Sequence, residues 1–90
     1  MRLDRFLKLS RIVKRRSVAQ EMISHGAVRV GMAEVKPSKD VKPGDIIEVA
    51  FPRKIVTVRV TSVEEHAVRR GEGAYEIIEE RAVTGEERPW

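Results

Sequence analysis

The sequence predicts a small α+β domain in which two short amino-terminal helices pack on a mostly antiparallel β-sheet. In the first quarter of the chain apolar residues recur at helical spacing, whereas later apolar and polar residues alternate as in strands. Glycine and proline residues separate the alternating segments. The chain has 90 residues, of which 41% are hydrophobic, so it can bury one core. We therefore predict a single domain over residues 1–83 and a frayed tail over residues 84–90.

The first helix is predicted over residues 3–10. Asp4 falls in its first turn, where a carboxylate complements the positive end of the helix dipole. Arg5 and Lys8 lie between the apolar positions, so we expect them to face solvent. The opposite face is expected to comprise Leu3, Phe6, Leu7 and Ser10.

A second helix is predicted to begin at Ser17, after a basic connection over residues 11–16. Ser17 and Gln20 have the spacing of a capping box, in which the hydroxyl accepts from a free amide and the glutamine reaches back. Gly26 is expected to end this helix in the left-handed conformation. The apolar side of the helix is expected to comprise Val18, Ala19, Met22 and Ile23.

A β-hairpin is predicted where residues 28–30 alternate, Gly31-Met32 interrupts the pattern, and the chain resumes through Val35. The common type I′ turn would require a positive φ at Met32, which is unfavourable for a residue with a side chain. A type II′ turn requires a glycine only at the first central position. We therefore predict a type II′ turn at Gly31-Met32.

The rest of the chain is predicted to complete the sheet. Pro43-Gly44 has the residue preferences of a type II turn, since proline fixes the first central φ and glycine supplies a positive φ at the second. Residues 64–74 contain two glycines and many charges, so we predict a mobile loop there. Three further strands are predicted, over residues 46–51, 55–63 and 75–78.

Positive charge is concentrated at the amino terminus. The first sixteen residues carry seven basic side chains against one acidic side chain, a net charge of +6, whereas the whole chain carries +4. A solvated helix face could carry such charges, but the interleaved apolar residues favour a folded surface that binds a polyanion. Five of the seven are arginines, which grip phosphate through two N–H groups and suit folded RNA read through its backbone. The predicted RNA-binding residues are Arg2, Arg5, Lys8, Arg11, Lys14, Arg15, Arg16 and Lys36.

The composition argues against several classes of function. The chain has no cysteine, which excludes disulfides and thiolate metal sites, and no apolar segment of membrane-spanning length. His25 and His66 have no evident catalytic partner. The acidic pairs Glu64-Glu65 and Glu79-Glu80 would each point to opposite faces of a strand and are interpreted as a solvated edge. We expect a cytoplasmic protein without enzymatic activity, cofactor, metal site or membrane contact.

An ordered set of spaced residues runs through the first half of the chain: Arg2-Leu3-Asp4, Leu7, Arg11, Arg16, Ala19, Ile23, Gly26, Val28, Val30, Lys36-Pro37-Ser38 and Gly44-Asp45. This set resembles the S4 RNA-binding domain, which takes its name from a ribosomal protein, and the resemblance covers about residues 1–50. The resemblance implies the α+β fold predicted above and a capacity to bind RNA. The chain departs from the family at Gly31-Met32, where Asn-Gly is usual.

Among S4-domain proteins the chain most resembles small stand-alone factors of bacterial ribosome-associated quality control. This resemblance implies a complex with the split large ribosomal subunit, in which Arg2 and Arg16 contact 23S rRNA and the P-site peptidyl-tRNA. The other basic residues would support them, although Lys36 could equally just flank a proline turn. The resemblance also implies an RqcH-type tailing factor on the same particle, which adds alanine to the stalled chain. We expect the protein to be a monomer.

Two alternative functions stay open. A related heat-shock-type factor recycles large subunits that are blocked by peptidyl-tRNA, and the resemblance extends to that factor. A protein-interaction adaptor without RNA would instead use an exposed sheet edge or the acidic carboxyl-terminal segment. Binding to RNA should weaken steeply as the salt concentration rises, whereas binding to a protein alone should not.

Overall fold

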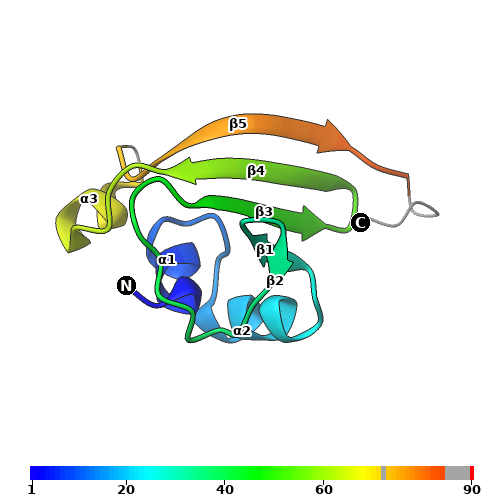
Figure 1. The fold of residues 1–90 in the computed structure, drawn as a ribbon, viewed down its shortest axis with the longest axis horizontal. Coiled ribbons are helices and arrows are strands. Elements are labelled where there is room, and N and C mark those ends of the chain that lie inside the picture. Colours follow the sequence, from blue (N-terminus) through cyan, green and yellow to red (C-terminus); the bar gives the residue numbers. More distant parts are fainter. Residues whose placement is uncertain (72, 85–89) are drawn as a thin grey trace.

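The protein is a two-layer α+β domain, and the fold class predicted from the sequence is confirmed. The computed structural model describes residues 1–71, 73–84 and 90. Its elements are α1 (Leu3–Leu9), α2 (Arg16–Ser24), β1 (Val28–Val30), β2 (Ala33–Glu34), β3 (Ile46–Phe51), β4 (Lys54–Val60), α3 (Glu65–Arg70) and β5 (Tyr75–Ala82). The strands form one antiparallel sheet in the order β2-β1-β3-β4-β5. Helices α1 and α2 lie against one face of this sheet, and α3 lies at one end of it (Figure 1).

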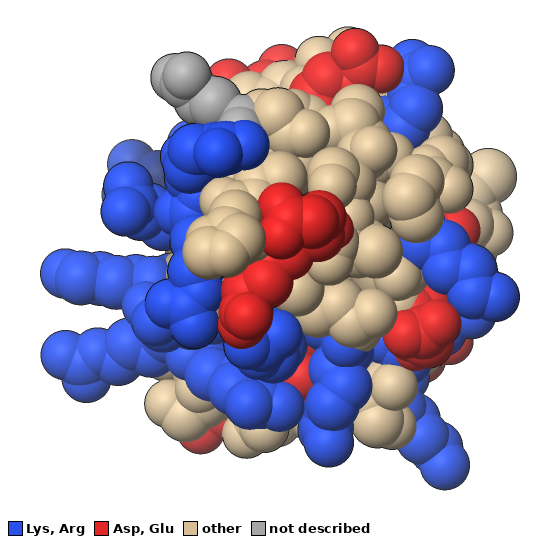
Figure 2. All heavy atoms as spheres, turned by 90° about the vertical axis from the view of Figure 1, so that its left-hand side faces the viewer, with Lys and Arg blue, Asp and Glu red and all other residues tan. Residues whose placement is uncertain are grey.

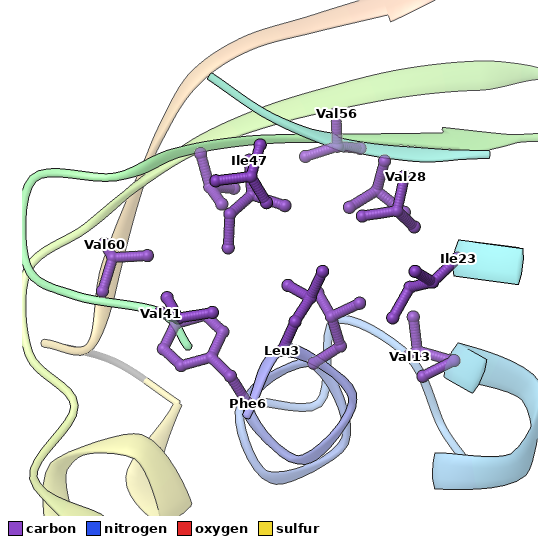
Figure 3. Packing of buried hydrophobic residues seen from close by; sticks show 14 of the residues in the cluster. Leu3, Phe6, Val13, Ile23, Val28, Val41, Ile47, Val56 and Val60 are labelled. Carbon is purple, nitrogen blue, oxygen red and sulfur yellow. The ribbon is translucent and has the colours of Figure 1, made fainter. Parts of the chain in front are cut away.

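The core lies between the sheet and the two amino-terminal helices. Leu3, Phe6 and Leu7 are fully buried, as the helical spacing predicts, and α2 contributes Ala19 and Ile23. Burial of each large apolar side chain stabilises the fold by about 1.5–3 kcal/mol. Figure 3 shows side chains from the helices and from the sheet meeting in this layer. Because their inner faces are fixed in this way, α1 and α2 hold their outward residues in defined positions.

The segment that follows β2 runs beside the start of α1. The N–H of Leu3 donates to the carbonyl of Lys39 at 2.8 Å, and the N–H of Asp4 donates to the carbonyl of Pro37 at 3.2 Å. The first N–H groups of a helix have no partner within it, and no side chain caps α1 at Arg2. The chain around Pro37 therefore serves as the cap, which places this segment next to the amino terminus.

Helix α2 begins at Arg16 rather than at Ser17, and the predicted capping box is wrong. Arg15 occupies the position before the helix, and no side chain caps the helix there. Gln20 does not reach back to the helix start but donates to the carboxylate of Asp4 at 2.9 Å. A hydrogen bond to a charged carboxylate is stronger than one to a neutral backbone group, which explains why Gln20 is engaged there.

Only part of the predicted apolar side of α2 enters the core. Ala19 and Ile23 are buried, whereas Met22 is partly buried and Val18 is exposed. Val18 and Met22 line an apolar groove of about 780 Å³ together with the end of β3. Gly26 follows the helix with a φ of 79°, the left-handed conformation that the sequence predicts.

Residues 64–74 are not simply a mobile loop, because α3 forms within them. The carboxylate of Glu64 accepts from the N–H groups of His66 and Ala67, both at 3.0 Å, and thereby caps the helix. Val68 is fully buried and anchors the helix to the core. The two glycines and the many charges of this segment are more typical of a loop, so the sequence did not predict a helix. The stability of the helix depends on this cap and on one apolar contact.

The strand bounds agree with the sequence for β3 and differ for the two strands that follow. The strand predicted over residues 55–63 ends at Val60, and the strand predicted over residues 75–78 continues to Ala82. Strand β5 pairs along the whole of β4, so it must match the length of β4. The predicted frayed tail falls mainly on residues 85–89, which lie outside the described residues. Trp90 is described, and its indole N–H donates to the carbonyl of Gly26 at 3.0 Å.

The hairpin turn differs from the predicted type. Gly31 and Met32 have φ values of 60° and 66°, and Val30 pairs with Ala33. Positive φ at both central residues defines a type I′ turn, so the prediction of a type II′ turn is wrong. The twist of a type I′ turn matches that of the paired strands, which outweighs a cost of about 1–2 kcal/mol for the left-handed Met32. By contrast, the turn at Pro43-Gly44 is as predicted, with a φ of 94° at the glycine.

Replacing Met32 with glycine should stabilise the domain by up to about 1 kcal/mol, because glycine adopts a positive φ without strain. Met32 is 75% exposed, so the substitution removes little apolar burial. Replacing Gly31-Met32 with Asn-Gly should have a similar effect, whereas Gly31→Val should destabilise the hairpin. Urea unfolding followed by circular dichroism measures these differences. Met32→Ala keeps the strain and serves as the control; equal stability of the glycine and alanine variants would contradict the prediction.

Candidate RNA-binding surface

The carboxylate of Asp4 is fully buried at the start of α1 and gathers donors from both amino-terminal helices. Arg2 donates to each carboxylate oxygen at 3.2 Å, and Gln20 donates at 2.9 Å. Arg16 donates through Nη2 at 3.4 Å and approaches the other oxygen through Nε at 3.3 Å. The backbone N–H of Arg5 donates at 2.7 Å. We call Arg2, Asp4, Arg16 and Gln20 the Asp4 cluster.

The Asp4 cluster keeps its carboxylate ionised. Burial alone would raise the pKa of Asp4, since a charge is disfavoured away from water. The side-chain hydrogen bonds from Gln20, Arg16 and Arg2, with the N–H of Arg5, outweigh burial and hold the pKa below its ordinary value of 3.8. The carboxylate is therefore negative at neutral pH, and it neutralises one of the two arginine charges.

The two arginines of the Asp4 cluster are held on one side and open on the other. The side chains of Arg2 and Arg16 are 51% and 43% exposed, respectively, although both bond to a carboxylate that water does not reach. Arg2 precedes α1 and Arg16 begins α2, so one buried acid fixes guanidinium groups from two helices. Fixing long side chains before binding reduces the entropy that a ligand must overcome. The arrangement is suited to hydrogen bonding with the oxygens of a phosphate group.

Basic side chains gather on the side of the molecule that holds α1 and α3. Figure 2, which looks onto this side, shows Lys and Arg along one side and the lower part of the face, with acidic side chains among them. Glu65, in the first turn of α3, accepts from both Arg5 and Arg69. The predicted residue Arg5 is therefore paired within the protein, and the pair ties α1 to α3.

The remaining predicted residues lie around α1 and α2. Lys8 is exposed in the last turn of α1, and Arg11 follows that helix with a left-handed φ of 65°. Lys14 and Arg15 are exposed in the connection before α2. Lys36 is also exposed, on the segment that caps the start of α1. The involvement of all the predicted residues in RNA binding stays a prediction.

Two features of this surface were not predicted from the sequence. Asp4 was expected only to complement the helix dipole, and its burial depends on contacts with α2 that spacing does not reveal. The short distance between Arg2 and Asp4 in the sequence was the available signal. Arg69 was placed in a loop, although Glu64 before the apolar residues and Gly71 after them are typical helix boundary residues.

The acidic pairs interpreted as a solvated strand edge have structural contacts. Glu79 and Glu80 lie on a strand, β5, but Glu64 and Glu65 lie at the start of α3, so their placement on a strand is wrong. Glu64 caps α3, Glu65 pairs with Arg5, and Glu80 pairs with Lys54 at 3.0 Å. Over the described residues, no group of three His, Cys, Asp or Glu side chains is placed to hold a metal ion. In the same part of the chain, no helix is long and apolar enough to cross a membrane.

Comparison with known proteins identifies the class of the chain and then its family. The model of the S4 domain matches residues 1–47, which include α1, α2, β1 and β2, so this is an S4-domain protein. Relatives named RQC P-site tRNA stabilizing factor occur in Bacillus subtilis and Halalkalibacterium halodurans. The first is 43% identical, covering 89% of this chain and 94% of the relative; the second is 40% identical, covering 97% and 100%. The chain belongs to the family of RQC P-site tRNA stabilizing factors.

A solved structure has the same fold. Heat Shock Protein 15 of Vibrio cholerae matches with a TM-score of 0.78 at 26% identity, covering 86% of this chain and 80% of that chain. The match extends well beyond the S4 domain, so the fold neighbour shares the carboxyl-terminal half as well. That structure is described as trimeric, which does not fit the monomer expected from the sequence.

Replacing Asp4 with asparagine should lower the free energy of unfolding by about 1–3 kcal/mol near neutral pH, because a buried charged acceptor is lost. The pKa of Asp4 is lowered in the folded state, so this stabilisation is fully present above pH 3.8 and is lost as the pH falls through the folded pKa. The difference between wild type and Asp4→Asn should therefore shrink below pH 3.8. Urea unfolding across pH measures it, and a difference that stays constant there would contradict the prediction.

Asp4→Asn also separates positioning from charge. The substitution makes the protein more positive, so attraction by charge alone predicts tighter RNA binding, whereas release of Arg2 and Arg16 predicts weaker binding. Asp40→Asn makes the same change in charge at an exposed site near the amino terminus and is the control. We expect weaker binding only for Asp4→Asn. Tighter binding by both variants would show that charge, and not position, decides affinity.

Proposed function

We propose that the protein is an RNA-binding factor of ribosome-associated quality control that acts on the split large ribosomal subunit in the cytoplasm. In this proposal it contacts 23S rRNA and the peptidyl-tRNA in the P site. The observation that carries the proposal is the Asp4 cluster, in which one buried acid presents two half-exposed arginines on a basic face. The names of the relatives support the link to P-site tRNA and to quality control.

The proposed mechanism is stabilisation of one position of the tRNA, without catalysis. A ligand shifts a conformational equilibrium by the difference in its affinity for the two states. Fixed guanidinium groups discriminate between positions of a phosphate backbone better than mobile charges do, because their N–H groups have a defined direction. A small domain whose surface arginines are held in place by its own core can therefore hold peptidyl-tRNA in the P site while another factor acts.

That other factor is proposed to be an RqcH-type tailing factor, which extends the stalled chain with alanine on the same particle. The proposal that the two act together rests on family resemblance. The names of the relatives refer to stabilization of P-site tRNA, and a tRNA held in the P site is what such an extension would need.

Two other functions have specific support. The fold similarity to Heat Shock Protein 15 favours the heat-shock-type alternative. The recycling of large subunits blocked by peptidyl-tRNA, which this alternative includes, rests on family resemblance. The edge strand β5 exposes Ile77 and Ile78, at 57% and 46%, which favours an adaptor that binds a protein chain at this edge. The adaptor function would leave the basic face without a ligand, so the RNA-binding functions account for more of the surface.

Replacing both Arg2 and Arg16 with glutamine should weaken association with large subunits by at least about tenfold, since two phosphate-binding charges are lost. Glutamine keeps an N–H donor for Asp4, so the buried carboxylate does not lose all its side-chain partners. Co-sedimentation with purified large subunits measures binding, and circular dichroism checks the fold. The control is Glu79→Gln with Glu80→Gln, on the acidic strand β5, which should not weaken binding. Wild-type co-sedimentation of the arginine variant would sink the assignment of this site.

Deleting the gene should eliminate alanine tails on stalled chains while the tailing factor is still expressed. Wild-type protein supplied from a plasmid should restore the tails, and the variant with glutamine at positions 2 and 16 should not. Mass spectrometry of stalled chains measures tail length. Tails of normal length in the deletion strain would refute the quality-control function and favour the recycling factor.

A further inference from the structure

A small basic notch opens where the end of α1 meets α3. The notch has a volume of about 160 Å³, which is room for a few water molecules or a small anion. A Cβ atom on Gly71, directly after α3, would lie 3.4 Å from the carbonyl oxygen of Ser10, so the chain after α3 runs close to the end of α1. The residues that line the notch are Lys8, Leu9, Arg11 and Arg69.

Three of these four residues are cations. Arg69 lies 3.4 Å from Glu65, which it shares with Arg5, so one carboxylate serves two arginines. Lys8 and Arg11 take part in none of the ion pairs formed among the described residues. Cations that converge without matching acids raise the local potential, and an anion held between them relieves the repulsion. Arginine and lysine together are typical ligands of phosphate.

Arg11 occupies the notch at the expense of backbone strain. Its φ of 65° is the left-handed conformation in which helices commonly end, and glycine or asparagine adopts it with little strain. Compensation of the helix dipole does not require an arginine at this position, because Lys8 already lies in the last turn of α1. Strained residues of this kind cluster at binding sites. The end of α1 explains the conformation of Arg11 but does not call for a cationic side chain there, whereas an anion in the notch would.

We propose that the notch binds one backbone phosphate of the RNA that the Asp4 cluster contacts. Helix α1 has seven residues, so the two sites lie roughly 10 Å apart along it, and one RNA could reach both. Arg69 lies outside residues 1–47, which match the S4 domain. In this proposal α3 extends the RNA-binding surface beyond that domain. The inference rests on the proposed function, because the phosphate belongs to RNA of the large subunit.

The test compares Arg69→Gln with Lys54→Gln. Both substitutions remove one positive charge, and both side chains are more than half exposed and paired with a glutamate, but Lys54 lies at the opposite end of the sheet. Affinity for purified large subunits is measured over a range of KCl concentrations. Loss of one phosphate contact should reduce the slope of log K against log salt by about 0.7–0.9 and weaken binding several-fold. We expect this for Arg69→Gln only, with Arg69→Lys close to wild type.

Arg11→Gly supplies an independent measurement. This variant should unfold at a higher urea concentration than wild type, because the strain is relieved, and should nevertheless bind large subunits more weakly. Unchanged affinity and slope for both Arg69→Gln and Arg11→Gly would overturn the notch as a phosphate site. If the glutamine variant of Arg2 and Arg16 then still fails to bind, the proposed function stands without the notch. Failure of the wild-type protein to bind large subunits would overturn both.

Discussion

The buried carboxylate of Asp4 is the interaction on which the basic surface depends. It lies on the first turn of α1, it is reached by no water, and it accepts from side chains on both amino-terminal helices. A buried charge is costly unless it is fully hydrogen-bonded, and here two of the donors, Arg2 and Arg16, are also the residues proposed to contact RNA. Arg2 and Arg16 therefore reach this geometry only when the core folds, because it requires α1 to pack against α2.

Strands β4 and β5 pair charged side chains with each other. Lys54 pairs with Glu80 and Arg59 with Glu76, both at 3.0 Å, across the antiparallel strands β4 and β5. Exposed pairs of this kind stabilise a sheet by only a few tenths of a kcal/mol to about 1 kcal/mol each. They also keep the acidic strand from cancelling the field of the amino-terminal face. The net positive charge is thus left around α1 and the two helices that contact it, α2 and α3.

Prediction from the sequence succeeded where a local pattern decides the structure. Helical spacing gave α1, and the turn at Pro43-Gly44 follows from the φ preferences of its two residues. Prediction failed where a distant partner decides. The spacing of Gln20 from Ser17 fits a local helix cap, but in the structure Gln20 donates to the buried Asp4 instead. A spacing rule cannot account for a competing partner on another helix. Helix α3 has few local signals and depends on the burial of Val68 in a core that forms from the whole chain.

Among the described residues, the two with side chains that hold a left-handed conformation show why backbone strain has to be interpreted together with its surroundings. Met32 is exposed at the tip of a hairpin, and its backbone carbonyl accepts from Arg29, so the turn geometry and this bond account for the conformation. Arg11 also ends an element, but its side chain lines a notch with two other cations. Strand twist explains the conformation of Met32, and the end of α1 explains that of Arg11, whose N–H donates to the carbonyl of Lys8 at 3.1 Å. The helix end does not require an arginine, because glycine adopts the same φ with less strain. The proposed phosphate contact in the notch would account for an arginine at this position.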